Sequence, residues 1–76
     1  MTADRLCEEQ VFIDDEFVFW RVVAIIENPG PPQVTLVRLE YGPSLSGLNH
    51  VRVLARSDFD ALRRNRHFVE LDMGGG

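Results

Sequence analysis

The sequence of 76 residues contains a single cysteine, Cys7, so no disulfide can form within the chain. A lone thiol fits the reducing interior of a cell, and we expect a cytoplasmic protein. A zinc site is not expected either, because Cys7, His50 and His67 are scattered along the chain without the spacing of metal ligands. A single core gives a domain of this size only about 3–5 kcal/mol of stability. Self-association or a protein partner is therefore predicted as additional support.

Long apolar runs are also missing. The longest, residues 17–26 (FVFWRVVAII), has ten residues with Arg21 in its middle, whereas a membrane-spanning helix needs roughly 20. Charged residues occupy the region where a signal peptide would be apolar, namely Asp4, Arg5, Glu8 and Glu9. We therefore expect neither a membrane span nor a secretion signal. The composition, 45% hydrophobic and 26% charged, is that of an ordinary globular domain.

Lysine is absent, and the basic residues are all arginines. The net charge of −4 is distributed unevenly along the chain. Residues 1–16 hold six acids against Arg5, whereas residues 50–67 hold five arginines against Asp58 and Asp60. Arginine prefers partners that it can bind in bidentate geometry, such as carboxylates and phosphates. The arginine-rich segment is therefore expected to pair with the acidic end of the chain or with a phosphate.

Residues 17–26 are predicted to form a strand, because five of the ten are β-branched and three are aromatic. The run is followed by Asn28-Pro29-Gly30-Pro31, where Pro29 and Gly30 suit the two central positions of a type II turn. The chain then resumes as residues 33–41 (QVTLVRLEY), with β-branched, aliphatic and aromatic residues at alternate positions. The two runs predict a long β-hairpin.

Shorter elements are predicted from local patterns. Ser57-Asp58-Phe59-Asp60 is a capping box, with a serine N-cap and an acid three residues later, and it predicts a helix through Arg64. Asn65 suits the position after the helix end. Glycine, proline and serine predict a loop at residues 42–47. Strands are expected at residues 11–13, 49–55 and 68–71.

This order of elements resembles that of the SH3-like small β-barrels, which include Tudor and KOW modules and have a short helical turn before the last strand. The resemblance covers residues 10–72 and implies a mainly β, five-stranded barrel with one short helix. It carries over no functional residue, because the sequence has neither an aromatic cage nor the KOW glycine pattern. An open antiparallel sheet with the helix packed on one face is the alternative. Residues 1–9 are expected to be flexible or a short helix, and residues 73–76 a disordered tail.

The strand over residues 17–26 is apolar on both faces. Strict alternation places the core set on one face: Val18, Trp20, Val22, Ala24 and Ile26. It places on the other face Phe17, Phe19, Arg21, Val23 and Ile25. Because a one-sided antiparallel sheet has a polar outer face, either another part of the chain or a partner must cover this second set. The leading hypothesis is a protein-interaction module, a homodimer that uses the second set as its interface.

A nucleic-acid-binding barrel is the alternative function. It would use the arginines between residues 52 and 66, which are Arg52, Arg56, Arg63, Arg64 and Arg66. The sequence pI of about 4.9 disfavours binding to a polyanion. Two of these arginines also have a local role at the predicted helix C-terminus, where positive charge is favourable.

Catalytic residues, cofactor sites and metal ligands are not predicted. Asp14-Asp15-Glu16 is expected to be a solvated turn, because adjacent side chains of an extended chain point to opposite sides and converge poorly on one ion. No nucleophile is paired with a base in the sequence, and we therefore expect a protein without enzymatic activity and without a cofactor.

Overall fold

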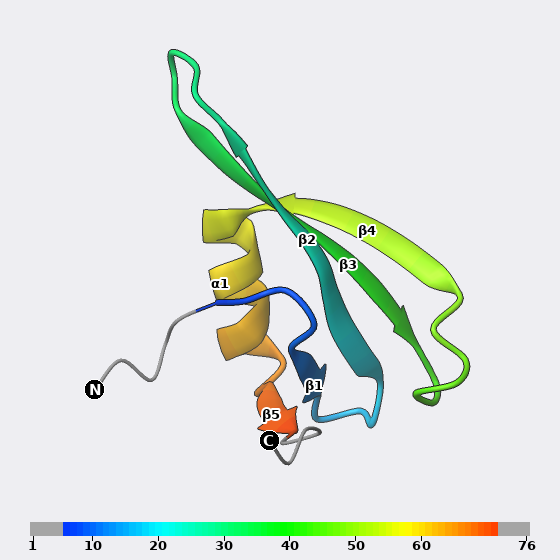
Figure 1. Ribbon diagram of the computed structural model, residues 1–76. Helices are drawn as coiled ribbons and strands as arrows, with labels where there is room; N and C mark the ends of the chain where they lie inside the picture. The colour runs from blue at the N-terminus through cyan, green and yellow to red at the C-terminus, as the bar shows by residue number, and fades with distance from the viewer. Residues whose placement is uncertain (1–5, 72–76) are drawn as a thin grey trace.

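The computed structural model describes residues 6–71. The strands are β1 (Val11–Ile13), β2 (Phe19–Asn28), β3 (Val34–Gly42), β4 (His50–Ala55) and β5 (Val69–Leu71), and the helix is α1 (Arg56–Asn65). All five strands form one antiparallel sheet in the order β4-β3-β2-β1-β5 (Figure 1). The predicted mainly β fold with one short helix is confirmed. The expected C-terminal tail lies outside the described residues, as do the first five residues of the expected N-terminal segment.

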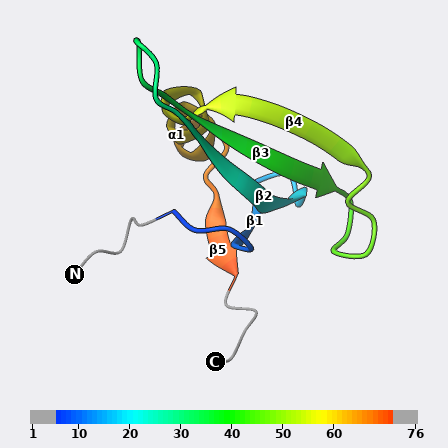
Figure 2. The ribbon, with the colours of Figure 1, turned by 45° about the horizontal axis from the view of Figure 1, so that its top comes forward.

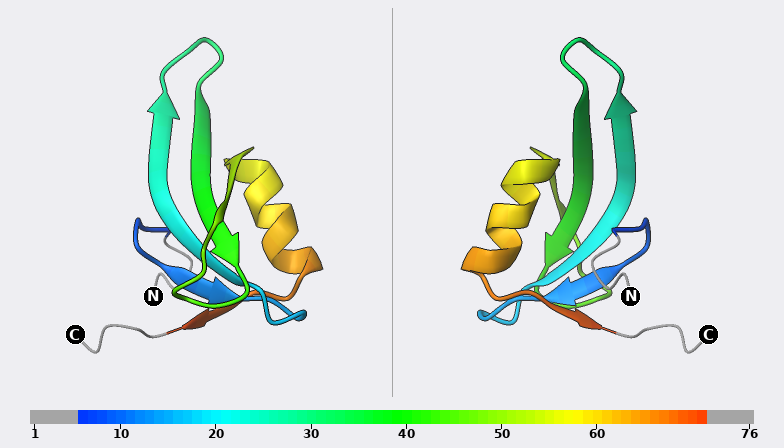
Figure 3. Two further views of the ribbon diagram at one scale, coloured as in Figure 1. Left: turned by 90° about the vertical axis from the view of Figure 1, so that its right-hand side faces the viewer. Right: turned by 90° about the vertical axis from the view of Figure 1, so that its left-hand side faces the viewer.

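β2 and β3 form the predicted long hairpin. Their pairing runs from Phe19 opposite Gly42 to Asn28 opposite Val34. The tip of the hairpin projects beyond the rest of the molecule (Figures 1 and 3). Gly30 in the connection has a φ of +60°, a left-handed conformation that glycine adopts without a steric penalty. This conformation is the one that the predicted turn requires of Gly30.

A β-bulge in β2 explains why this strand is apolar on both faces. The register against β3 shifts between Val22 and Ala24, so that Val23 is an extra residue. One extra residue reverses the alternation of side chains beyond it. Ile25, predicted on the second face, therefore packs against the core, whereas Ile26 is 44% exposed. The predicted alternation is correct as far as Val22 and wrong beyond it.

The core lies between the sheet and α1, which packs against β3 and β4 (Figure 3). Its buried residues are Phe12, Trp20, Val22, Val37, Leu39 and Phe59. Phe59, the buried residue of α1, meets Phe12 edge to face with ring centroids 6.2 Å apart. The ring centroid of Phe68, just before β5, lies 5.5 Å from that of Phe12 and 5.4 Å from that of Trp20. This aromatic cluster joins α1 to β1, to β2 and to the segment just before β5.

The sheet is not closed into a barrel. β4 and β5 are its two edges and lie apart, and no pairing between them is present in residues 6–71 (Figure 2). The expected barrel closure is therefore not shown, and the arrangement is an open sheet with α1 on one face. An edge strand has neighbours on one side only, so β4 leaves a row of backbone groups free to pair with another strand.

The helix begins one residue before the predicted N-cap. Its N-cap is Ala55, the last residue of β4, and no side chain caps the helix. Ser57 is exposed within the first turn. At the other end Asn65 is still helical, and the residue with positive φ is His67 at 55°. The predicted capping role of Ser57 is wrong, because β4 runs directly into the helix without the loop that a serine cap needs. The predicted role of Asn65 is wrong because the helix continues through it to a C-cap at Arg66.

Replacement of this serine tests the boundary. We expect Ser57→Ala to leave the free energy of unfolding within about 0.5 kcal/mol of the unmodified chain, because the hydroxyl caps nothing and alanine favours a helix. Urea denaturation at pH 7 measures the difference. A loss of about 1 kcal/mol, typical of a true N-cap, would contradict the boundary.

Candidate interaction surfaces

Asp14 is a structural residue at the turn between β1 and β2. Its side chain is buried, and its Oδ1 accepts hydrogen bonds from the backbone N–H groups of Glu16 at 2.8 Å and Val18 at 2.9 Å. Its Oδ2 accepts one from Trp20 Nε1 at 3.0 Å and lies 3.5 Å from Arg66 Nη1. The prediction of a solvated turn is correct for its two acidic neighbours, which are exposed, but wrong for Asp14.

Several causes act on the pKa of Asp14. Burial on its own raises this pKa, because it disfavours the charged form. The hydrogen bonds from Val18, Trp20 and Glu16, together with the charge of Arg66, outweigh burial and lower the pKa below its ordinary value. Asp14 is therefore a carboxylate at neutral pH that holds the β1–β2 turn against the C-terminal end of α1.

The face of the sheet opposite α1 is the first candidate surface. Cross-strand partners share a face, so residues of β2, β3 and β4 form rows across it. The rows are Arg21–Glu40–Val51, Ala24–Arg38–Val53 and Ile26–Leu36–Ala55, and we call these residues the outer face. Outside the Arg21–Glu40 ion pair, Arg38 is the one charged residue among them.

Apolar exposure on the outer face is concentrated at the edge of the sheet. Val51 and Val53 of β4 are 54% and 50% exposed. Arg38, opposite Val53, is exposed and has no hydrogen-bond or ionic partner within residues 6–71. Apart from the Arg21–Glu40 ion pair, the outer face is thus an apolar surface with one unpaired cation, and it ends at an edge strand that is free to pair.

Of the five residues predicted as an interface, alternation along β2 places Phe19 and Arg21 on the same face, opposite α1. Phe17 is 76% exposed in the β1–β2 turn, with a φ of 63°. Arg21 lies on the outer face, whereas Ile25 packs against the core. Phe19 and Val23 are half-buried. Of the five, Arg21 is the residue that the register joins to the exposed valines of β4.

The five predicted nucleic-acid-binding arginines separate into different environments. Arg66 donates to Glu16 Oε1 at 3.1 Å and lies against Asp14, as the alternative of pairing with the acidic N-terminal region predicted. Arg52 lies on β4 opposite Leu39, on the side of the sheet that faces α1. The remaining three, Arg56, Arg63 and Arg64, lie on α1.

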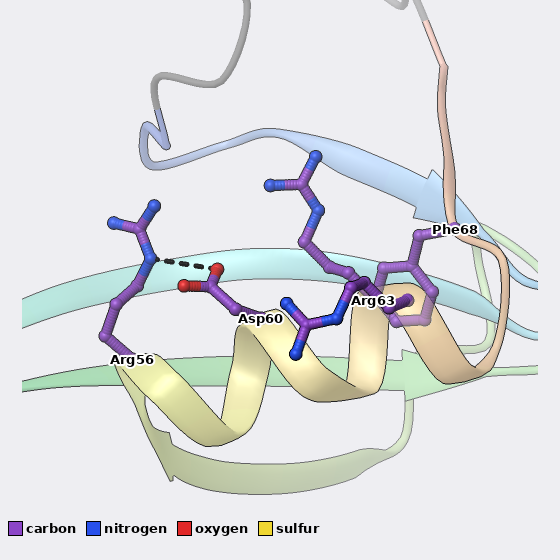
Figure 4. A pocket seen from close by; sticks show the side chains of 5 residues that line it. Arg56, Asp60, Arg63 and Phe68 are labelled. Atoms are coloured by element: carbon purple, nitrogen blue, oxygen red, sulfur yellow. Dashed lines mark hydrogen bonds and ion pairs between the residues drawn. The ribbon is translucent and has the colours of Figure 1, made fainter.

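These three helical arginines line a hollow of about 420 Å³ together with Asp60 and Phe68 (Figure 4). Arg56 Nε donates to Asp60 Oδ1 at 3.2 Å. The guanidinium carbon of Arg63 lies 5.2 Å from the ring centroid of Phe12. Arg64 is exposed and has no hydrogen-bond or ionic partner in the described part of the chain. The hollow is the second candidate surface.

Sequence reasoning did not single out Val51, Val53 or Arg38. The strand containing the two valines was recognised, but alternation alone does not say which of its faces is inward. The signal that decides is Leu54, which packs against the core and so turns Val51 and Val53 outward.

Across residues 6–71, no three His, Cys, Asp or Glu side chains are grouped so that they could hold a metal ion. Nor does any helix in this range combine the length and the apolar composition that crossing a membrane requires.

Comparison with known proteins gives no match among protein-family models, curated proteins or solved structures.

Proposed function

We propose that this chain is a small, non-enzymatic protein-interaction module that self-associates through the outer face and the free edge of β4. The observation that carries the proposal is the half-exposure of Val51 and Val53 on a strand with an unpaired edge. The proposed interface therefore differs from the one predicted along residues 17–26. It lies mainly on the neighbouring strands and keeps Arg21 from the predicted set.

The free edge of β4 favours a second copy of the chain as the partner. Two β4 strands related by a two-fold axis pair antiparallel, and this arrangement is self-complementary. It satisfies the free backbone groups of both edges and continues the outer face from one subunit to the other. β4 (HVRVLA) contains neither proline nor lysine, residues that often protect an edge from such pairing. Arg52 points to the other side of the sheet and leaves the outer row uninterrupted.

Backbone pairing and apolar contact both favour reversible association. Each hydrogen bond formed between the two β4 edges contributes roughly 1 kcal/mol. Val51 and Val53 also become cross-strand neighbours of β4 in the second copy, which contributes roughly 0.2–1 kcal/mol for each pair. Together these contributions supply several kcal/mol against the entropic cost of association. We expect a dissociation constant in the micromolar range.

The fold that we propose for this module is the SH3-like one. Its support is the position of α1 immediately before the last strand, within a five-stranded antiparallel sheet. In this interpretation the barrel is open between β4 and β5, and the second copy occupies the free edge of β4. We also propose a cytoplasmic location for the module, where a lone cysteine stays reduced.

Nucleic-acid binding through the predicted arginines is the alternative that we do not favour. Arg66 is already engaged by two carboxylates, and the net charge of −4 repels a polyanion. Those carboxylates, Asp14 and Glu16, add negative charge at the C-terminal end of α1.

Amide hydrogen exchange at two protein concentrations tests the proposal. We expect the amides of β4 to become more protected at the higher concentration, because pairing with a second β4 removes them from water. The amides of β5, at the opposite edge of the sheet, serve as the internal control and should not change. Equal changes at both edges, or no change in β4, would contradict an interface at β4.

A further inference from the structure

We infer that the hollow on α1 lined by Arg56, Arg63 and Arg64 binds a small phosphate monoester. This site lies on the helix and shares no residue with the outer face. The inference is therefore independent of the proposed self-association.

The net positive charge of the hollow favours an anionic ligand. Three guanidinium groups line it against one carboxylate, that of Asp60. Positions 56, 60, 63 and 64 are spaced by one and two helical turns, so their side chains extend from one side of α1. The excess of two positive charges matches the charge of a phosphate dianion better than that of a single carboxylate.

The state of each arginine suits reversible binding. Arg63 is held over Phe12 and Phe59, with its guanidinium carbon 5.2 Å and 5.9 Å from their ring centroids, so that its orientation is restricted. Arg64 is exposed and has no partner in the described residues, so its donors are available. Arg56 shares its charge with Asp60 through a half-exposed ion pair. An arriving phosphate oxygen competes with that carboxylate for Arg56.

The dimensions of the hollow accommodate more than a bare ion. A volume of about 420 Å³ is within the range of small-molecule sites. Phe68 adds an aromatic wall beside Arg63 (Figure 4), against which an attached sugar or base can pack. These features favour a compound of the size of a nucleoside monophosphate.

NMR titration of the full chain with adenosine 5′-monophosphate at low salt tests the inference. We expect the arginine Nε–Hε signals of α1 to shift, with a dissociation constant in the millimolar range or below. Arg64→Gln should weaken binding about tenfold, the usual effect of losing a hydrogen bond to a charged group. Asp60→Asn should strengthen binding roughly twofold to fivefold, because it removes the competing carboxylate. A merely structural role for Asp60 does not predict tighter binding.

Arg38→Gln is the matched control, since Arg38 is also exposed and unpaired but lies on the outer face. It should leave the affinity unchanged. Equal weakening by Arg38→Gln and Arg64→Gln would overturn the site in favour of general charge attraction. The absence of any shift at millimolar ligand would overturn the inference as well. Much tighter binding of a ten-residue oligothymidylate than of the monophosphate would overturn it in favour of nucleic-acid binding.

Discussion

Asp14→Ala is expected to destabilise the protein by about 3 kcal/mol at pH 7. The substitution leaves the indole N–H of Trp20 and two backbone N–H groups without their acceptor, and each buried unpaired donor costs roughly 1–3 kcal/mol. A domain of this size has only about 3–5 kcal/mol in total, so most of its stability is lost. Urea denaturation followed by circular dichroism measures the loss. The fluorescence of Trp20, the single tryptophan, reports on the same site.

The matched control for this variant is Asp15→Ala. Asp15 is exposed and has a single side-chain contact, with His67 at 3.2 Å, so its loss should change stability by no more than about 0.5 kcal/mol. Equal denaturation midpoints for the Asp14 and Asp15 variants would contradict the structural role of Asp14.

The stabilisation by Asp14 should also depend on pH. Its pKa is lower in the folded chain than the value of about 3.9 expected when unfolded. A lowered carboxyl pKa means that the stabilisation is complete above the unfolded pKa and is lost as the pH falls through the folded one. The difference between the unmodified chain and Asp14→Ala should therefore be constant near neutral pH and shrink below about pH 4. A difference that grows on acidification would contradict the sign of this pKa shift.

The double variant Val51→Glu and Val53→Glu is expected to be a folded monomer. Both valines are half-exposed on β4, so the substitutions leave the core intact. In a two-fold interface they would place four carboxylates close together, and burying like charges is strongly unfavourable. Val53 lies opposite Arg38, which offers one new carboxylate a partner within the monomer, whereas Val51 lies opposite Glu40, so the other new carboxylate lowers the stability of the monomer modestly. We expect the dissociation constant of the dimer to rise at least tenfold, measured by sedimentation velocity.

Val69→Glu is the control for this pair. Val69 is 59% exposed on β5, the other edge of the sheet, so the same chemical change is made outside the proposed interface. It should leave the association unchanged. Equal loss of association in both variants would show that added negative charge, and not the β4 interface, is responsible.

The hairpin could be predicted because its signals are local. β-Branched and aromatic residues mark both strands, and the glycine with positive φ lies where the turn chemistry places it. The helix was also recognised from local residues, but its first residue was not. Whether Ser57 is a cap depends on where β4 ends, and pairing with β3 determines that boundary.

The bulge at Val23 could not be predicted, because nothing in a run of apolar residues marks the extra one. The shift appears only in the pairing with β3, and it decides that Ile25 packs against the core while Ile26 does not. The burial of Asp14 could not be predicted for a similar reason. Trp20 and Arg66, the donors that lie farthest from Asp14 in the sequence, are brought to its carboxylate by the fold. The spacing of the acids at residues 14–16 says nothing about these two donors.

The candidate surfaces depend still more on tertiary structure. The arginines of residues 52–66 look like one cluster in the sequence, yet Arg66 pairs with the β1–β2 turn and Arg52 lies on a strand. The apolar excess of residues 17–26 suggested an interface along β2, whereas the most exposed valines of the outer face are on β4. The packing of Leu54 against the core and the unpaired edge of β4 define that surface, and both are properties of the assembled sheet.

Sedimentation equilibrium of the unmodified chain tests the central claim, self-association, most directly. Loaded from micromolar to millimolar concentration, the protein should show a weight-average mass that rises from the 8.7 kDa of one chain to twice that value and then stays constant. A plateau at twice the chain mass is the result expected of a closed two-fold interface. A mass of one chain at every concentration would contradict self-association.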